Sequence, residues 1–262
     1  MSSSMSSESE IVVQTRHLGK AYQLYAHRND WLKQVLFGWW KDYFKPFWVL
    51  RDIDLDVKRG ESIGILGRNG CGKSTLLQVI CGMTLPSHGE LRVTGRIAPV
   101  LALGSTFDLE LSGRENVMIG GAVLGLKRAD VLRKFDSIAE FAGIGDYMEQ
   151  PCKHYSMGMR TRLAFSICAH VEADILVVDE ALAVGDAAFQ RKCLDWIDNF
   201  RKTGTLLFVS HSMTEVRRLC SRAIWIEDGR IRAQGEPNEV IRGYQRALLV
   251  EKDDVHRFSA GE

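Results

Sequence analysis

The stretch that decides the fold is Gly67-Arg68-Asn69-Gly70-Cys71-Gly72-Lys73-Ser74-Thr75. It has the G-x-x-x-x-G-K-[ST] spacing of a phosphate-binding loop. An apolar segment from Ser62 to Leu66 predicts a strand before it, and Ser74 to Cys81 predicts the start of a helix after it. The glycines let the backbone turn its N–H groups toward a polyphosphate, and the helix directs its positive end to the same place. The loop therefore predicts a nucleoside triphosphate site.

A second informative segment lies about a hundred residues later, where the apolar run Ile175 to Val178 ends on Asp179 and Glu180. Such a run is typical of a strand buried on both faces of a parallel sheet, and ligands bind at the carboxyl ends of such strands. We expect Lys73 to contact the β- and γ-phosphates, and Ser74 and Asp179 to hold Mg²⁺. Glu180 would polarise the attacking water, a role that gains roughly 10²–10⁴-fold in rate. The two segments predict an α/β fold of the P-loop NTPase class that binds and hydrolyses ATP.

Three more segments narrow the class of ATPase. Leu206 to Ser210 predicts another buried strand, with His211 at its end, although a lone histidine after a strand is more often structural than catalytic. Ser156 is a suitable N-cap for a helix that opens in the segment 155–159. Asp186 ends the segment that follows the acidic pair. In this order and at these separations, the set resembles the nucleotide-binding subunit of an ATP-binding-cassette (ABC) transporter, from about Val12 to Val250.

The resemblance implies a homodimer that holds ATP between two copies. Residues 155–159 would be the signature segment, in which Ser156 and Gly158 act on the γ-phosphate held by the other copy. Asp186 would couple the two sites, and His211 would contact the γ-phosphate. Tyr22 matches the aromatic residue that stacks on adenine, although a tyrosine beside a strand is often only packed there.

One part of the family pattern is missing. Members usually carry a Gln before the helical subdomain, where it helps to bind Mg²⁺ and contacts the membrane partner. This chain has no Gln between Gln78 and Gln150, and the corresponding loop, residues 101–107, is small and apolar. The loop can still transmit motion, but the resemblance gives it no metal ligand.

An aromatic insertion occupies residues 25–48. It holds nine of the chain's 23 aromatic residues and four of its six tryptophans. Apolar pairs recur every four residues from Trp31 to Phe44, which predicts one apolar helical stripe that Pro46 should end. Gly38 weakens this helix by about 1 kcal/mol. The helix either packs on its own domain or contacts a membrane subunit or lipid; we favour the contact, because so much exposed tryptophan is costly in water.

With the insertion, the signature segment and the Asp179 to Asp186 segment together, the chain is similar to the ATPase subunits of polysaccharide exporters for O-antigen, teichoic acid or capsule. This similarity implies a separate permease subunit, contact of residues 31–44 with the membrane, and a place on the cytoplasmic face of the inner membrane. About a dozen residues follow Val250, which matches the short form without a carbohydrate-binding domain. The alternatives are an exporter of a drug or lipid, a soluble ABC ATPase, and a P-loop kinase.

Composition and charge set the remaining limits. The 34 basic and 33 acidic residues nearly cancel, so nothing favours nucleic acid as a partner. The longest uncharged apolar stretches reach about a dozen residues, and about twenty are needed to span a bilayer. Six scattered cysteines without a C-x-x-C pair suit a reducing cytosol. We expect a disordered tail at 1–10 without a secretory signal, an ATPase domain at 11–251 with a helical subdomain at 104–154, and a second tail at 252–262.

Within the ATPase domain, the ranges 11–16 and 48–57 predict strands of a small antiparallel sheet. Ser112-Gly113-Arg114-Glu115 predicts a capping box at the start of a helix, and a further helix is expected over 128–141. Asp228-Gly229 predicts a hairpin turn, and Pro237 predicts the start of a last helix that ends near Val250.

Overall fold

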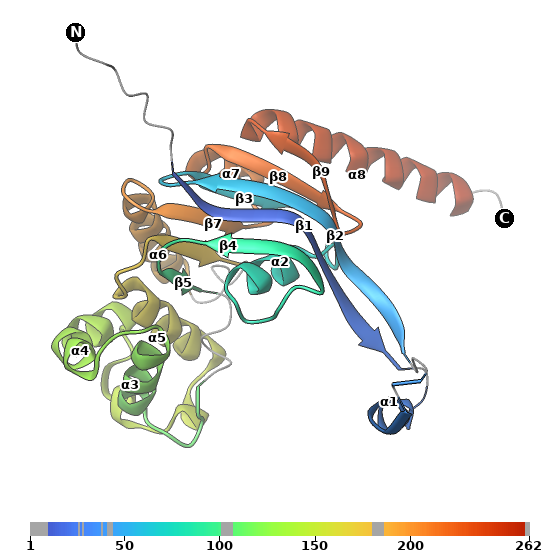
Figure 1. The fold of residues 1–262 in the computed structure, drawn as a ribbon. Helices are drawn as coiled ribbons and strands as arrows, with labels where there is room; N and C mark the ends of the chain where they lie inside the picture. The colour runs from blue at the N-terminus through green and yellow to red at the C-terminus, as the bar shows by residue number, and fades with distance from the viewer. Residues whose placement is uncertain are drawn as a thin grey trace, which may run out of the picture.

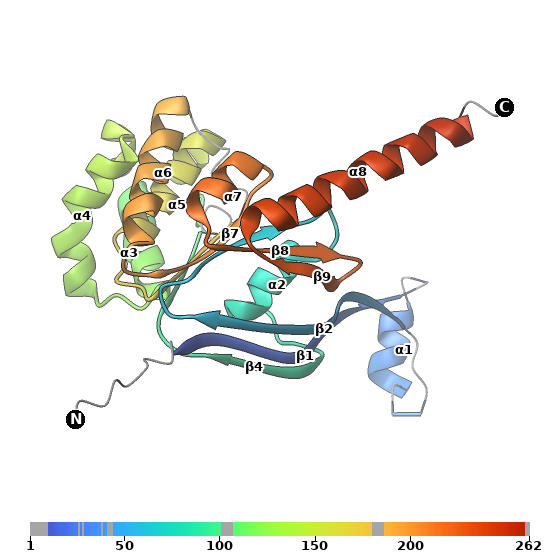
Figure 2. The same cartoon turned by 90° about the horizontal axis from the view of Figure 1, so that it is seen from above.

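The structure is a computed structural model that describes residues 10–25, 27, 29–37, 39–40, 44–100, 107–179 and 186–259, with the backbone alone at residues 37 and 250–259. In this part of the chain two sheets lie over one another, with helix α2 (Lys73–Ile80) between them (Figures 1 and 2). Leu76 and Leu77 of α2 are fully buried in a core that receives side chains from both sheets. The α/β architecture with a small antiparallel sheet agrees with the prediction.

The larger sheet carries the strands that the sequence predicts to be buried. In spatial order it comprises β5 (Ile97–Pro99), β6 (Ile175–Val178), β7 (Thr205–Val209), β3 (Ser62–Leu66), β8 (Arg222–Glu227) and β9 (Arg230–Gly235). All neighbours are parallel except β8 and β9. Every residue of β3, β6 and β7 is buried, because helices or the second sheet cover both faces. The carboxyl ends of these three strands therefore meet at one edge.

The smaller sheet is antiparallel, with the order β2-β1-β4. Its strands are β1 (Ile11–Leu24), β2 (Lys45–Lys58) and β4 (His88–Val93). The first two are longer than the predicted ranges 11–16 and 48–57, and their pairing runs from Ile11 opposite Lys58 to Leu24 opposite Lys45. Irregular register lies between, and His17 and Asp52 adopt positive φ angles of 47° and 57°. These bulges break the alternation that sequence analysis uses to follow a strand.

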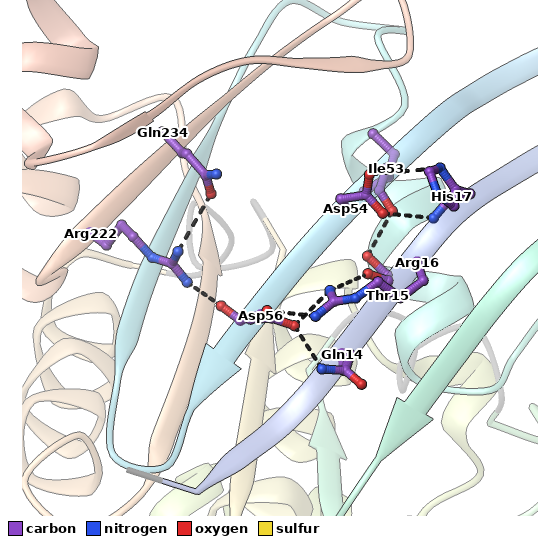
Figure 3. Close-up of polar contacts among 9 residues, drawn as sticks. All are labelled: Gln14, Thr15, Arg16, His17, Ile53, Asp54, Asp56, Arg222 and Gln234. Atoms are coloured by element: carbon purple, nitrogen blue, oxygen red, sulfur yellow. Dashed lines mark hydrogen bonds and ion pairs between the residues drawn. The ribbon is translucent and has the colours of Figure 1, made fainter. Parts of the chain in front are cut away.

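Polar side chains tie the two long strands together around these bulges (Figure 3). The Asp56 carboxylate accepts hydrogen bonds from Arg16 at 2.8 Å and from Gln14 at 3.1 Å. The Thr15 hydroxyl donates to the carbonyl oxygen of Ile53 at 2.8 Å. The backbone N–H of His17 donates to Asp54 at 2.7 Å. The ladder is thus held in place by side chains where its backbone pairing is interrupted.

A group of helices lies beside the β5 edge of the larger sheet (Figures 1 and 2). It comprises α3 (Gly113–Val123), α4 (Arg128–Ala142), the short 3₁₀ helices η2 (Gly145–Glu149) and η3 (Cys152–His154), and α5 (Met157–Ala169). The predicted capping box is present: Ser112 and Glu115 hydrogen-bond reciprocally at the start of α3. The predicted helix 128–141 matches α4. Since α5 packs on α3 and α4, the boundary of the subdomain at residue 154 stays a prediction.

Three further helices follow the acidic strand. They are α6 (Ala187–Phe200), α7 (Met213–Leu219) and α8 (Pro237–Ser259). The predicted hairpin turn between β8 and β9 is present, with positive φ at Asp228 and Gly229. The start of α8 at Pro237 also matches, and its first turns pack on β8, with Ile241 buried. The helix continues past the predicted end at Val250, and its C-terminal part projects away from the sheets (Figure 2).

The insertion forms an arm at the far end of β1 and β2 (Figure 1). Helix α1 spans Asp30–Phe37 only, so the prediction of one helical stripe to Phe44 is wrong. Pro46 does not end a helix; it lies in β2 opposite Gln23. Two causes act together: Gly38 disfavours helix, and β2 is an edge strand that tolerates proline while it extends the ladder.

Candidate active site

The phosphate-binding loop connects β3 to α2. Gly67 approaches β8 so closely that a Cβ there would lie 2.4 Å from the carbonyl oxygen of Ile226. Gly72, with φ of 107°, precedes α2, and a Cβ at this position would lie 2.9 Å from the carbonyl oxygen of Val49. Both glycines are therefore required by close backbone contacts. The tight loop leaves the N-terminus of α2 facing a cavity of about 430 Å³ lined by Lys73, Ser74 and Thr75.

Lys73 is the charged group of this cavity. Its side chain is only 6% exposed, and its Nζ donates to the carbonyl oxygens of Gly67 at 2.9 Å and Arg68 at 3.0 Å. A buried ammonium group is stable only with such acceptors. The loop thus holds a positive charge under its own backbone, next to the helix N-terminus, where phosphate oxygens are favoured.

Ser74 and Asp179 come together at the same edge. The Ser74 hydroxyl at the start of α2 donates to the Asp179 carboxylate at 2.7 Å. Asp179 follows β6, and β7 separates this strand from β3, so parallel pairing brings two distant segments to one point. A hydroxyl and a carboxylate form the hard oxygen donor set that Mg²⁺ prefers. The pair fits the predicted metal site.

His211 follows β7, the strand between β3 and β6, and its side chain is exposed at the same edge. The backbone around it is fixed by Ser210, whose hydroxyl donates to Glu215 at 3.0 Å, and by Ser212, which caps α7. The proposed base Glu180, the segment 181–185 and the loop residues 101–106 lie outside the described residues. Their predicted roles stay predictions.

The signature segment opens α5, as predicted. The Ser156 hydroxyl oxygen accepts from the backbone N–H of Met159 at 3.2 Å, which makes Ser156 the N-cap. Its own hydroxyl hydrogen can still be donated. Gly158 lies in the first turn of α5. Neither residue lines the cavities at the phosphate loop. Within one chain, the structure does not bring this segment to the loop.

Asp186 links the start of α6 to α5, the helix that the signature segment opens. Its carboxylate caps α6 by accepting from the backbone N–H of Phe189 at 2.9 Å, and it forms an ion pair with Arg162 of α5. The bond from Phe189, followed by the charge of Arg162, holds the pKa of Asp186 below its usual value despite some burial. Asp186 therefore ties two elements of its own chain together, a contact that the sequence did not indicate.

A larger cavity of about 660 Å³ lies beside the phosphate cavity. Its lining includes the loop residues Arg68 to Cys71, the start of β2, and the β8–β9 turn. Phe47 and Trp48 line it, whereas Tyr22 does not; Tyr22 lies opposite Phe47 in the ladder and is 39% exposed. The sequence missed Phe47, because only the strand register shows that it neighbours Tyr22. Cys71 lines this cavity and not the phosphate cavity.

Comparison with known sequences identifies proteins that are related to this chain. A family profile described as ABC transporter matches residues 50–183. The chain is 44% identical to the ABC transporter protein AbcA of Aeromonas salmonicida, over 95% of this chain and 81% of the relative. It is 40% identical to the O-antigen export system ATP-binding protein RfbB of Klebsiella pneumoniae, over 90% and 98%. It is 41% identical to the teichoic acids export ATP-binding protein TagH of Listeria monocytogenes, over 89% and 70%.

Solved structures share the fold at lower sequence identity. A dimeric post-hydrolysis state of the ATP-binding cassette MJ0796 with ADP and Pi matches with a TM-score of 0.70 and 17% identity, covering 86% of this chain and 98% of that chain. The ATP-binding subunit of an ABC transporter matches with a TM-score of 0.71 and 20% identity, over 92% and 98%. At these identities the comparison bears on the fold alone.

Proposed function

This chain belongs to the ABC transporter family, and on that premise we propose that it is the ATP-hydrolysing subunit of an exporter that moves a lipid-linked polysaccharide across the cell membrane. The similarity to export proteins for O-antigen and teichoic acids supports this choice of substrate over a drug or a lipid. The subunit would act on the cytoplasmic face of the membrane with a separate permease.

The observation that carries the ATPase assignment is the meeting of Lys73, Ser74 and Asp179 at one sheet edge. Lys73 and the α2 N-terminus would bind the phosphates through charge and backbone donors. Ser74 and Asp179 would hold Mg²⁺, whose positive charge would offset the negative charge of the phosphate oxygens. Glu180, next in the chain, would accept a proton from the attacking water, and His211 would contact the γ-phosphate from β7.

A second copy of the chain would complete the site. Ser156 and Gly158 lie at a helix N-terminus that can bind an anion, and they do not line the loop cavities of their own chain. The dimeric state of similarly folded cassettes supports a homodimer. In this arrangement the α5 N-terminus of each copy would close over the γ-phosphate held by the other.

The arm would contact the membrane partner or the lipid surface. Trp39 and Trp40 are 85% and 82% exposed, and four apolar residues of α1 are also exposed: Trp31, Leu32, Val35 and Leu36. Tryptophan beside Lys33 suits the boundary between apolar and polar surroundings. No helix in the described part of the chain has the length and apolar character needed to cross a bilayer. In the proposed transporter the permease would supply the pathway, and the arm would bring this subunit to it.

The test is a pull-down from detergent-solubilised membranes of the source cells. The chain would be compared with a Trp39→Ser, Trp40→Ser variant and with a control, Leu85→Ser, Leu249→Ser, which changes exposed leucines elsewhere. We expect the wild type and the control to recover a multi-spanning membrane protein together with bound lipid-linked polysaccharide. The arm variant should recover much less of both.

Each contrary result has a distinct meaning. Equal recovery by all three chains would mean that the arm packs on its own domain and does not bind the membrane partner. The transporter assignment would still hold. If no chain recovers a membrane protein, the assignment to an exporter is wrong, and a soluble ABC ATPase takes its place.

A further inference from the structure

Asn116 of α3 is a buried polar side chain outside the site described above, with 1% of its surface exposed. Its Nδ2 lies within hydrogen-bond distance of three carbonyl oxygens, those of Asp108 at 2.9 Å, Ser112 at 3.0 Å and Leu111 at 3.2 Å. Its Oδ1 accepts from the backbone N–H of Asp108 at 2.9 Å. A buried amide with all its partners in place rigidifies what it contacts. One side chain therefore fixes the backbone of residues 108–112, just before α3.

The same amide contacts the segment that leads to the signature serine. The Nδ2 of Asn116 lies 3.3 Å from the Sγ of Cys152, which is fully buried. Cys152 opens η3, and its backbone N–H donates to the carbonyl oxygen of Leu111 at 2.8 Å. The backbone N–H of Lys153, next in η3, donates to the carbonyl oxygen of Leu109 at 2.8 Å. Two segments that lie far apart in the sequence are therefore joined around one amide.

Contacts within η3 connect Cys152 to Ser156. The backbone N–H of Tyr155 donates to the carbonyl oxygen of Cys152 at 3.1 Å. Tyr155 is buried, and Gly113 at the start of α3 makes room for it: a Cβ on this glycine would lie 2.2 Å from the Tyr155 hydroxyl oxygen. Ser156 follows directly and begins α5 as its N-cap. The position of the Ser156 hydroxyl thus depends on a chain of contacts that begins at Asn116.

We propose that Asn116 is a positioning residue for ATP hydrolysis, which holds Ser156 where its hydroxyl can donate to the γ-phosphate bound by the other copy. The inference rests on the proposed function, in which Ser156 acts across the dimer. Asn116 lines neither cavity at the phosphate loop, so it acts through the serine. Without the amide, the buried carbonyl oxygens of residues 108–112 lose their donor, and this segment can shift together with η3. A misplacement of about 1 Å can cost roughly a hundredfold in rate.

A double-mutant cycle distinguishes positioning from support of the fold alone. Phosphate release at saturating Mg-ATP and protein would be measured for the wild type, Asn116→Ala, Ser156→Ala and the double variant. We expect Asn116→Ala to lower the rate at least about tenfold through misplacement of the serine. Ser156→Ala should lower it roughly a hundredfold, the effect of losing one donor to developing charge. The double variant should match Ser156→Ala within about twofold, because a residue that acts only by placing the serine then has nothing to place.

Controls exclude damage to the fold. All chains would be compared at a temperature at which circular dichroism shows them folded, and their dissociation constants for Mg-ATP, measured by calorimetry, should agree within about twofold because the phosphate loop is a separate segment. Ser112→Ala removes the N-cap of α3 but leaves the amide contacts of Asn116, so it should hydrolyse ATP within about twofold of the wild-type rate. If Asn116→Ala does not fold, Asn116→Asp replaces it in the cycle, since it keeps the shape and the acceptor but lacks the amide donors.

Each contrary result overturns a different statement. Hydrolysis at the wild-type rate by Asn116→Ala would overturn the inference and leave the proposed function intact. A double variant slower than Ser156→Ala by the full factor of Asn116→Ala would mean that the amide supports the fold without positioning the serine. Unchanged hydrolysis by Ser156→Ala would remove the serine from the site, and this inference with it. A wild-type chain that does not hydrolyse ATP would refute the proposed ATPase function itself.

Discussion

At the scale of single residues, the reactivity of the Cys71 thiol measures how accessible the phosphate-binding loop is. Its thiol lines the cavity beside Phe47, and Gly67 makes room for it: a Cβ built on that glycine would lie 2.5 Å from Sγ. Burial raises the pKa of the Cys71 thiol above its usual value, although the positive charge of Lys73 opposes the shift. Since the thiolate is the reactive form, labelling should be slow at neutral pH.

We expect iodoacetamide to modify Cys71 faster as the pH rises from 7 to 9, to abolish ATP hydrolysis, and to be blocked by Mg-ATP. Mass spectrometry would measure the modified fraction, and Cys71→Ser would serve as the control that keeps activity under the same treatment. Full hydrolysis by a chain whose Cys71 is confirmed as alkylated would mean that the cavity is more open than described.

Among the elements, the β1–β2 hairpin has a pH-sensitive contact at its bulges. The imidazole of His17 lies 2.7 Å from Asp52, and the hydrogen bond to Asp52, followed by the charge of Asp54, raises the pKa of His17. A raised pKa means that the folded chain binds the proton more tightly than the unfolded chain. The contact therefore stabilises the fold at pH below the unfolded value near 6.5, and this stabilisation is lost as the pH rises through the folded pKa.

The matched variant is Asp52→Asn, because asparagine tolerates the positive φ of this position. Nuclear magnetic resonance titration should show a lower His17 pKa in the variant. Urea unfolding should show a larger difference in stability between wild type and variant at pH 5.5 than at pH 8.5. The same difference at both pH values would mean that protonation of His17 has no part in holding the hairpin.

The elements also show where sequence reasoning succeeds and where it stops. β3, β6 and β7 were predictable because burial on both faces imposes continuous apolar runs, and the glycine loop follows from local geometry. The ends of β1 and β2 were not, because bulges at His17 and Asp52 interrupt the alternation. Phe47 lies in the part of β2 that was not predicted, so its position was not predicted either. Its place beside Tyr22 follows from strand register, a long-range property that the pattern of one segment does not contain.

For the whole molecule, the decisive test of the two-copy site concerns Glu180. We expect Glu180→Gln to bind ATP with normal affinity and to remain dimeric on size-exclusion chromatography with Mg-ATP, because the amide cannot accept a proton from water. The wild type should return to monomer as ATP is consumed. Lys73→Ala, which removes the buried ammonium group, is the control that should stay monomeric. Hydrolysis at the wild-type rate by Glu180→Gln would exclude this residue as the base.

The short distance between Phe47 and the arm along β1 and β2 has a mechanical consequence. Only two further residue pairs, Gln23 with Pro46 and Leu24 with Lys45, separate Tyr22 and Phe47 from the end of the ladder that carries α1. A hydrogen-bonded ribbon this short bends little between its ends, so a force at one end displaces the other. Phe47 lines the 660 Å³ cavity, so a movement of that cavity wall would also displace the arm with Trp39 and Trp40. The two strands would then couple the position of the arm to the shape of this cavity directly, without a rearrangement of the buried core.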